Sequence, residues 1–89
     1  DSGEADSYEL MNMGQAQMDN GNYDTAIIYF QNALELESVP NKQQITKAMI
    51  IAYEYSGDFA TAKSKMEEYM KDYPDDEDAA REYQFLETR

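Results

Sequence analysis

Residues 21–36, GNYDTAIIYFQNALEL, and residues 57–72, GDFATAKSKMEEYMKD, begin in the same way. Each stretch opens with glycine, a small polar residue and an aromatic residue, and each has alanine three positions after the aromatic residue. Gly21 and Gly57 are 36 positions apart (57 minus 21). A pattern that recurs at this distance within 89 residues predicts one supersecondary unit that is built twice.

The apolar residues of both stretches have the spacing of an α-helix. They recur at intervals of three and four residues, which places them on one helix face. In the first stretch they are Tyr23, Ala26, Ile27, Phe30, Ala33 and Leu34. In the second they are Phe59, Ala62, Met66, Tyr69 and Met70, and Tyr73 directly after the stretch continues the spacing. No segment alternates polar and apolar residues for long enough to predict a β-strand. The sequence therefore predicts an all-α fold with five helices, at about 7–20, 23–37, 42–56, 59–72 and 76–88.

Polar residues at the expected helix starts support these boundaries. Asp6 followed by Glu9, and Asn41 followed by Gln44, have the spacing of a capping box, in which two side chains satisfy backbone N–H groups reciprocally. Single N-caps are expected at the other three helices, from Asn22, from Asp58, and from Asp75 or Asp76.

The composition excludes several classes of site and partner. The chain has no cysteine and no histidine, which excludes disulfides, thiolate nucleophiles and the usual zinc ligand sets. Its formal net charge is −12, and lysine and arginine occur only from Lys42 onward. Such a field repels phosphate backbones and anionic lipid headgroups, so nucleic acids and membrane surfaces are unfavourable partners. No apolar run has the length that crosses a bilayer, so direct membrane insertion is not expected.

Residues 1–6, DSGEAD, are small and acidic and have no apolar anchor, which predicts a linker tail. We recognise no signal peptide in the sequence. The absence of cysteine agrees with a cytoplasmic protein and equally with an exported bacterial one, so the compartment stays open.

The repeated pattern resembles the tetratricopeptide repeat (TPR), a helix–turn–helix unit of 34 residues. The resemblance places a first repeat at 7–40, a second at 43–76 and a capping helix at 77–89. The residues that carry it in the first repeat are Leu10, Met13, Gly14, Tyr23, Ala26, Phe30 and Ala33. Those in the second are Met49, Tyr53, Phe59, Ala62, Met66 and Pro74. The implied architecture is an α-solenoid of two antiparallel hairpins, with Gly14, Ala26 and Ala33 small where helices approach closely.

The second repeat departs from the family pattern at Ile50, where a small residue is preferred. We expect this side chain to push the second hairpin apart or to tilt it. Two repeats are also few, because stacked repeats bury each other's faces and about three are normally needed for stability. The capping helix would close one end, whereas the start of helix 7–20 would be left for further repeats or for self-association.

The resemblance implies a function in protein–protein interaction. In TPR proteins the first helix of each pair lines a shallow concave groove that binds a peptide or a partner domain. The implied groove residues are Tyr8, Met11, Gln15, Met18, Lys47, Ile51, Glu54, Tyr55, Arg81 and Phe85. The apolar members at these positions favour apolar partner residues, and the surrounding acidic residues favour some basic ones. Of the cations and amides that some TPRs use to clamp a chaperone's terminal carboxylate, only Arg81 and in part Gln15 are present.

Two other function classes stay open at this point. The array could be a structural module that drives homo-oligomerisation or spaces the domains of a larger, bacterial envelope-associated protein. An enzyme would have only carboxylates, lysine, tyrosine and hydroxyls to use, and it would need a deep pocket with two facing carboxylates. The acidic stretches YPDDED and DNGNYD lack the spacing of a calcium loop and are interpreted as turns. We therefore expect a non-catalytic protein with no metal and no cofactor.

Overall fold

The computed structural model describes residues 6–88. This part of the chain contains five α-helices and no β-strand, which confirms the all-α prediction. The helices are α1 (Ser7–Asp19), α2 (Tyr23–Leu34), α3 (Lys42–Ser56), α4 (Phe59–Asp72) and α5 (Glu77–Glu87). The predicted tail, residues 1–6, lies outside the described residues except for Asp6. None of the five helices has the length and apolar character to cross a membrane.

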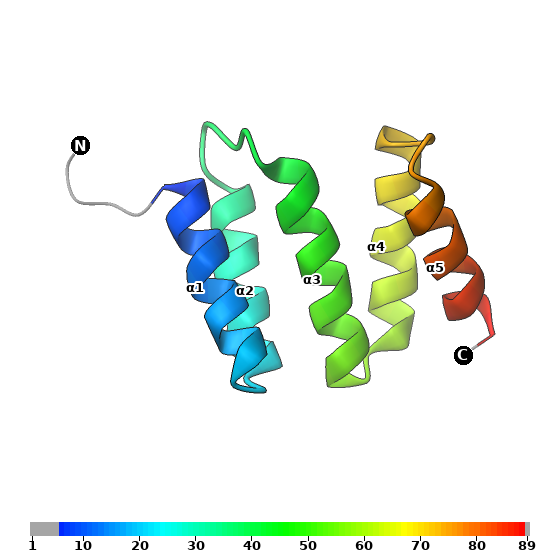
Figure 1. Ribbon diagram of the computed structural model, residues 1–89, viewed down its shortest axis with the longest axis horizontal. Helices are drawn as coiled ribbons and strands as arrows, with labels where there is room; N and C mark the ends of the chain where they lie inside the picture. The colour runs from blue at the N-terminus through cyan, green and yellow to red at the C-terminus, as the bar shows by residue number, and fades with distance from the viewer. Residues whose placement is uncertain (1–5, 89) are drawn as a thin grey trace.

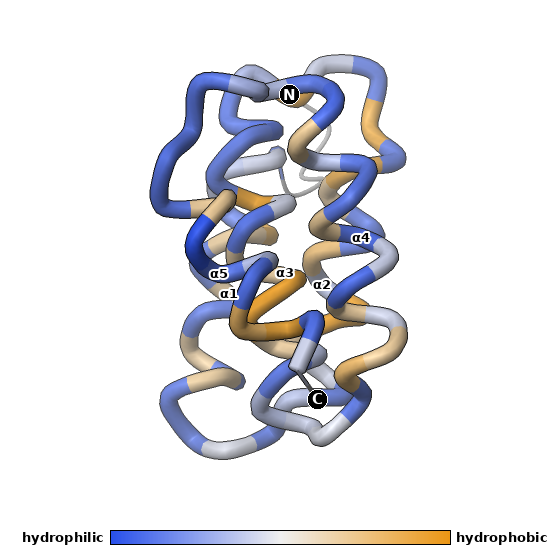
Figure 2. Tube along the Cα trace, turned by 90° about the vertical axis from the view of Figure 1, so that its right-hand side faces the viewer, coloured by the Kyte–Doolittle hydropathy of each residue, from blue (hydrophilic) through white to orange (hydrophobic). Residues whose placement is uncertain are grey.

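The helices form two consecutive antiparallel hairpins, α1–α2 and α3–α4, followed by α5 (Figure 1). In Figure 1, α1 lies in front of α2 and α5 in front of α4, so α1, α3 and α5 form one broad face of the molecule. The end-on view of Figure 2 agrees, with α1 and α5 on one side, α2 and α4 on the other, and α3 between them. The result is an elongated array of 45 × 28 × 16 Å.

Three of the five expected caps are present. Asp6 and Glu9 form the capping box of α1, in which the Glu9 backbone N–H donates to Asp6 Oδ1 at 2.9 Å. Asp58 accepts from the Thr61 backbone N–H, and Asp76 accepts from that of Ala79. Each aspartate therefore satisfies one of the N–H groups that a helix start leaves without an intrahelical partner.

The two asparagine caps were predicted wrongly. Asn22 and Asn41 stand at the N-cap positions of α2 and α3, but neither side chain bonds to its own helix. The Asn22 amide donates to Gln17 Oε1 at 3.0 Å, across the turn. The Asn41 amide donates to the Ser7 carbonyl oxygen at 3.3 Å and to Met11 Sδ at 3.5 Å, so it ties the inter-repeat segment to the start of α1. In both cases a bond outside the helix has replaced the cap bond: for Asn22 it crosses the turn, and for Asn41 it joins segments that are distant in the sequence.

The boundary between the repeats also differs from the expectation. Helix α2 ends at Leu34, three residues before the predicted end at residue 37. Pro40 disfavours helical conformation at the residue before it, so the segment that joins the repeats is extended or turned rather than helical. Gly21 and Gly57 supply the turns inside the hairpins, with φ of 80° and 90°, a region that other residues rarely adopt.

The first hairpin is closely packed because Gly14 lies directly against Phe30. A Cβ atom at position 14 would be only 2.5 Å from Phe30 Cε1, and the phenylalanine ring is fully buried. Around this contact a first core cluster joins α1, α2 and α3 through residues that include Ala26, Ala33 and Ile45. The small residues that the repeat pattern contains therefore lie where the helices approach, as expected.

The second hairpin is more open. In Figure 1, α3 and α4 separate as they leave their shared turn at Gly57. Ile50 stands where the first repeat has Gly14, and it is fully buried together with Tyr69 in a second core cluster that joins α3, α4 and α5. The bulk of these two side chains accounts for the wider separation, as expected from Ile50.

Helix α5 is held by a polar network at its start. Asp76 Oδ2 accepts from Lys47 Nζ at 3.0 Å and from the Tyr69 hydroxyl at 2.5 Å, and the Tyr69 oxygen accepts from Gln43 Nε2 at 2.9 Å. These bonds lower the pKa of the Asp76 carboxyl to about 2, first through Tyr69 and then through Lys47. Further along, the Tyr83 hydroxyl donates to Glu67 Oε2 at 2.6 Å. Both contacts fix α5 relative to the second hairpin.

Replacing Asn41 by alanine is expected to lower the free energy of unfolding by about 1 kcal/mol. The buried amide of Asn41 holds the Ser7 carbonyl oxygen, which would lose its side-chain partner. The loss stays moderate because Asn41 Oδ1 is itself buried without a hydrogen bond, and the substitution removes that cost. Urea unfolding followed by circular dichroism measures the effect, with exposed Asn32 replaced by alanine as the control. Equal stability of the two variants would contradict the role given to Asn41.

Candidate functional site: a groove between α3 and α5

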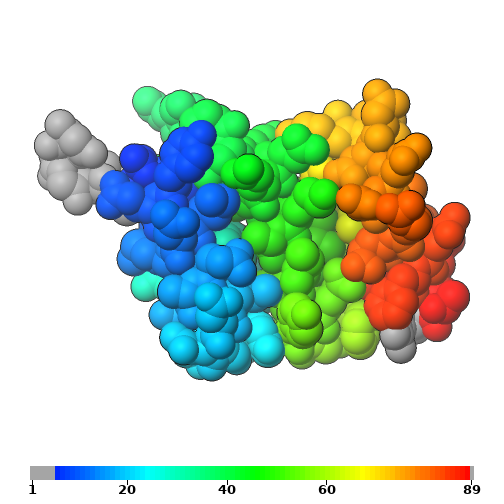
Figure 3. All heavy atoms as spheres, viewed as in Figure 1, coloured from blue at the N-terminus to red at the C-terminus, as the bar shows by residue number. Residues whose placement is uncertain are grey.

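A groove runs along the α1–α3–α5 face between α3 and α5 (Figure 3). Helix α5 packs on α4, and within residues 6–88 its backbone does not come close to that of α3. Side chains line the space between α3 and α5, and they enclose two adjoining hollows of about 380 and 180 Å³. Both hollows share Ile51 and Glu54 of α3 and Glu82 of α5, so they form one continuous depression.

Apolar side chains form much of the wall of this groove. Ile51, Phe85 and Tyr55 are 40, 41 and 66% exposed, and Phe59 adds a further ring at the same end. Large apolar groups that stay this accessible around a depression are typical of a contact surface, because their burial by a partner is favourable.

Two carboxylates, one from each helix, face the hollows. Burial raises the pKa of the Glu54 carboxyl to about 7, and the nearby charge of Glu82 contributes in the same direction. Glu54 Oε2 is shielded from solvent and has no hydrogen-bond partner within residues 6–88. Glu54 is therefore a carboxylate that an incoming positive group would stabilise.

The two cations expected to contact a partner are already paired. Lys47 is bound to Asp76, which raises the pKa of the Lys47 ammonium group, and its Nζ lies 5.9 Å from the centre of the Tyr69 ring. Arg81 is paired with Asp78 at the surface of α5. The charge that the groove offers to a partner is therefore mainly that of Glu54 and Glu82.

The structure brings half of the predicted groove residues together. Five of the ten predicted residues line this groove: Lys47, Ile51, Glu54, Tyr55 and Phe85. Arg81 is exposed next to the groove but does not line it. None of the four residues predicted in α1 lines it either: Tyr8, Met11, Gln15 and Met18.

The four residues of α1 differ in their surroundings. Met11 and Met18 are half-buried against the first core cluster, whereas Tyr8 and Gln15 point to solvent. Helix α1 approaches α3 more closely than α5 does, and its two methionines pack against a core cluster that includes Ile45 and Met49 of α3. The open part of the broad face is therefore its α3–α5 half.

Sequence reasoning missed six of the lining residues: the buried Ile50, Met66 and Ala79, and the more accessible Phe59, Asp78 and Glu82. A signal was present for two of them. Asp78, Glu82 and Phe85 are spaced by four and three residues and so form one stripe of α5, beside the buried stripe of Ala79 and Leu86. Of the two residues predicted in α5, Phe85 belongs to this stripe, whereas Arg81 is one position before Glu82 and lies beside it.

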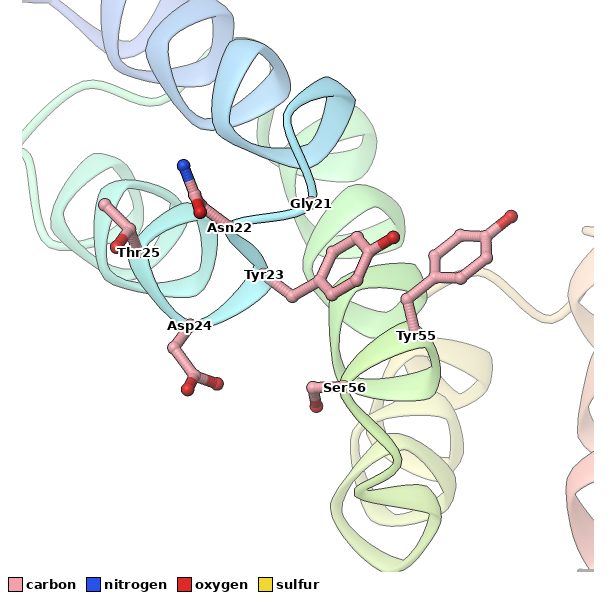
Figure 4. Close-up of a pocket in the computed structure, with 7 residues that line it drawn as sticks. All are labelled: Gly21, Asn22, Tyr23, Asp24, Thr25, Tyr55 and Ser56. Atoms are coloured by element: carbon pink, nitrogen blue, oxygen red, sulfur yellow. The ribbon is translucent and has the colours of Figure 1, made fainter.

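A third hollow, of about 450 Å³, lies between the turns of the two hairpins (Figure 4). Residues 21–25 line it on one side and Tyr55 and Ser56 on the other. The rings of Tyr23 and Tyr55 are stacked here, with centres 5.4 Å apart and planes inclined by 17°. Stacking of this kind stabilises the contact between the repeats, and it holds the Tyr55 ring at the end of the α3–α5 groove.

The described part of the chain holds no group of three acidic side chains arranged to bind a metal ion. Both acidic stretches discussed above instead supply turn and cap residues, of which Asp76 is the clearest example. The chemistry available at the groove is thus apolar contact, hydrogen bonding and carboxylate charge.

Comparison with known proteins agrees with the architecture. The family model described as tetratricopeptide repeat matches the chain twice, in one form at residues 7–38 and in another at residues 44–76. Neither the curated proteins nor the solved structures gave a match to the chain. TPR domains generally mediate protein–protein interaction, and they are typically scaffolds rather than enzymes. With two matched repeats on the hairpins α1–α2 and α3–α4, the chain belongs to the tetratricopeptide repeat family.

Proposed function

We propose that this protein is a non-catalytic interaction module that binds a segment of a partner protein in the α3–α5 groove. The observation that carries the proposal is the exposure of Ile51, Tyr55 and Phe85 around one continuous depression. An extended or helical segment would suit this groove, because its lining residues follow one another along two neighbouring helices, α3 and α5.

A catalytic function has less support. Glu54 and Glu82 line the same hollows from two helices, and a pair of carboxylates is what a glycoside-hydrolysing site would need. However, Ile51, Tyr55 and Phe85 at the larger hollow remain 40, 66 and 41% exposed, so they would not remove a small substrate from water. A surface of this kind fits a polypeptide better than a small molecule.

Random 16-residue peptides displayed on phage provide a probe for the groove. We expect peptides selected on the protein to lose at least about tenfold in affinity when Ile51 and Phe85 are both replaced by glutamine, as is usual for apolar anchors at an interface. Fluorescence anisotropy with the synthetic peptides measures the change, and circular dichroism checks that the variant keeps its helices.

The matched control is a second pair of exposed apolar residues away from the groove, Met13 of α1 and Ile28 of α2, also replaced by glutamine. Peptides that lose affinity equally in both variants, or only in the control, would argue against the groove. If the protein instead forms homo-oligomers through this surface, the molar mass measured by light scattering should double as the protein concentration rises. The Ile51/Phe85 variant should then keep the mass of the monomer.

A further inference from the structure

We propose that the α3–α5 groove binds its partner through one lysine or arginine side chain placed between Glu54 and Glu82, with apolar partner residues on Ile51 and Phe85. The inference rests on the proposed function and adds the chemistry of the partner. The two carboxylates come from different helices, and both line the smaller and the larger hollow.

Within the part of the chain that the structure describes, these two carboxylates have no cation of their own. Within residues 6–88 no ion pair and no hydrogen bond joins Glu54 or Glu82 to a lysine or an arginine. Lys47, which lines the smaller hollow, is engaged with Asp76, and Arg81 of α5 is engaged with Asp78. Two like charges on facing walls destabilise each other, and a cation placed between them would remove that repulsion.

Glu54 is partly buried in the wall of the groove. Its Oε2 atom is out of contact with solvent and accepts no hydrogen bond within the described chain. A shielded polar atom without a partner is costly, more so when it is ionised. An ammonium or guanidinium group reaching this position would supply the missing donor. This oxygen is therefore the point in the groove where a partner's donor gains most.

The groove combines apolar and acidic surface. Lysine and arginine have an apolar stem and a charged head, and the stem can lie on Ile51 while the head reaches Glu54. Beyond the groove, the net charge of −12 attracts a basic segment and repels an acidic one. Charge and shape therefore favour the same partner, an amphipathic segment with a basic residue among apolar ones.

Protonation of Glu54 gives the proposal a distinctive signature. Its carboxyl is faced by Lys47 from α3 and by Asp78 and Glu82 from α5, whereas α4 contributes only apolar residues, among them Met66. The pKa of the Glu54 carboxyl in the unbound protein is about 7. This carboxyl group must therefore lose its proton before it can pair with a cation. We therefore expect affinity to rise by about tenfold between pH 6 and pH 8, the increase in the ionised fraction of a group with this pKa.

The experiment uses the groove-binding peptides selected from the phage library. In each peptide one lysine or arginine is replaced by norleucine, which keeps the stem and removes the charge. We expect this to lower affinity for the wild-type protein by at least about tenfold, and to have little effect on the variant Glu54→Gln/Glu82→Gln. The same variant should lose the rise in affinity from pH 6 to pH 8.

The control variant Glu35→Gln/Glu37→Gln removes the same charge from an exposed segment outside the groove. It should keep the tenfold effect of norleucine, which separates local pairing from general attraction. Equal norleucine effects in all three proteins, or groove-binding peptides without a basic residue, would overturn this inference and leave the proposed function standing. Peptides insensitive to the Ile51/Phe85 substitutions would instead overturn the proposed function itself.

Discussion

Replacing Gly14 by valine is expected to lower the free energy of unfolding by about 2–3 kcal/mol, the cost of forcing extra atoms into a packed core. The first added atom would be 2.5 Å from Phe30 Cε1, 2.8 Å from Cδ1 and 2.9 Å from Cζ, all in one ring. That ring is fully buried against α3, so it has no open space to move into. For a small domain with a stability of about 5–15 kcal/mol, such a loss is a large share of the total. Urea unfolding measures it.

The control for Gly14 is Ala16, an exposed residue of the same helix. Its replacement by valine changes helix propensity by about 0.5 kcal/mol and meets no core atom. A second substitution, Phe30→Leu, replaces the ring that causes the clash by a smaller side chain. Added to Gly14→Val, it should recover part of the lost stability. If Gly14→Val and Ala16→Val were equally stable, the close approach of α1 and α2 would not depend on the glycine.

Features that depend on near neighbours in the chain could be predicted from the sequence. The spacing of Tyr23, Ala26 and Phe30 specifies one helix face, and the glycines at 21 and 57 specify turns. The bulk of Ile50 at a position usually small indicated a wider second hairpin. Each of these follows from the residue itself and from its immediate surroundings.

Features that depend on distant contacts could not be predicted. Asp76 was recognised as a candidate cap, but its bond to Lys47 joins residues 29 positions apart and forms only after α5 has packed. Likewise, whether a helix face is filled or left open depends on the distance between helices. Met11 and Met18 of α1 pack against the first core cluster, to which α3 contributes, whereas the backbone of α5 stays away from that of α3 and leaves the groove.

Tyr69 is the clearest example of a residue whose role depends on distant contacts. It corresponds to the small Ala33 of the first repeat, 36 positions earlier, yet it is among the largest fully buried side chains. Its ring packs in the second core cluster and lies 4.7 Å from the centre of the Tyr73 ring. Its hydroxyl donates to Asp76, the cap of α5. The side chain therefore supports α5, and with it one wall of the groove.

Replacing Tyr69 by alanine is expected to lower the free energy of unfolding by about 3–5 kcal/mol, as for other buried aromatic residues. The cavity would lie beneath α5, so peptide affinity for the groove should fall as well, although Tyr69 does not line it. Thermal unfolding and the anisotropy assay measure the two effects. Loss of stability with unchanged affinity in the folded fraction would show that the position of α5 does not depend on this residue.

Tyr69→Phe separates the hydroxyl from the ring. The ring still fills the core, so the loss of stability should be much smaller than for alanine. Asp76 loses its strongest stabilising bond, so its pKa should rise from about 2 toward the ordinary value. A lowered pKa stabilises the folded state above the unfolded pKa near 4, and that stability disappears as the pH falls toward 2. The wild type should therefore lose more stability than Tyr69→Phe between pH 4 and pH 2. Parallel losses would mean that the hydroxyl does not hold the charged form of Asp76, and that the packing of the ring alone positions α5.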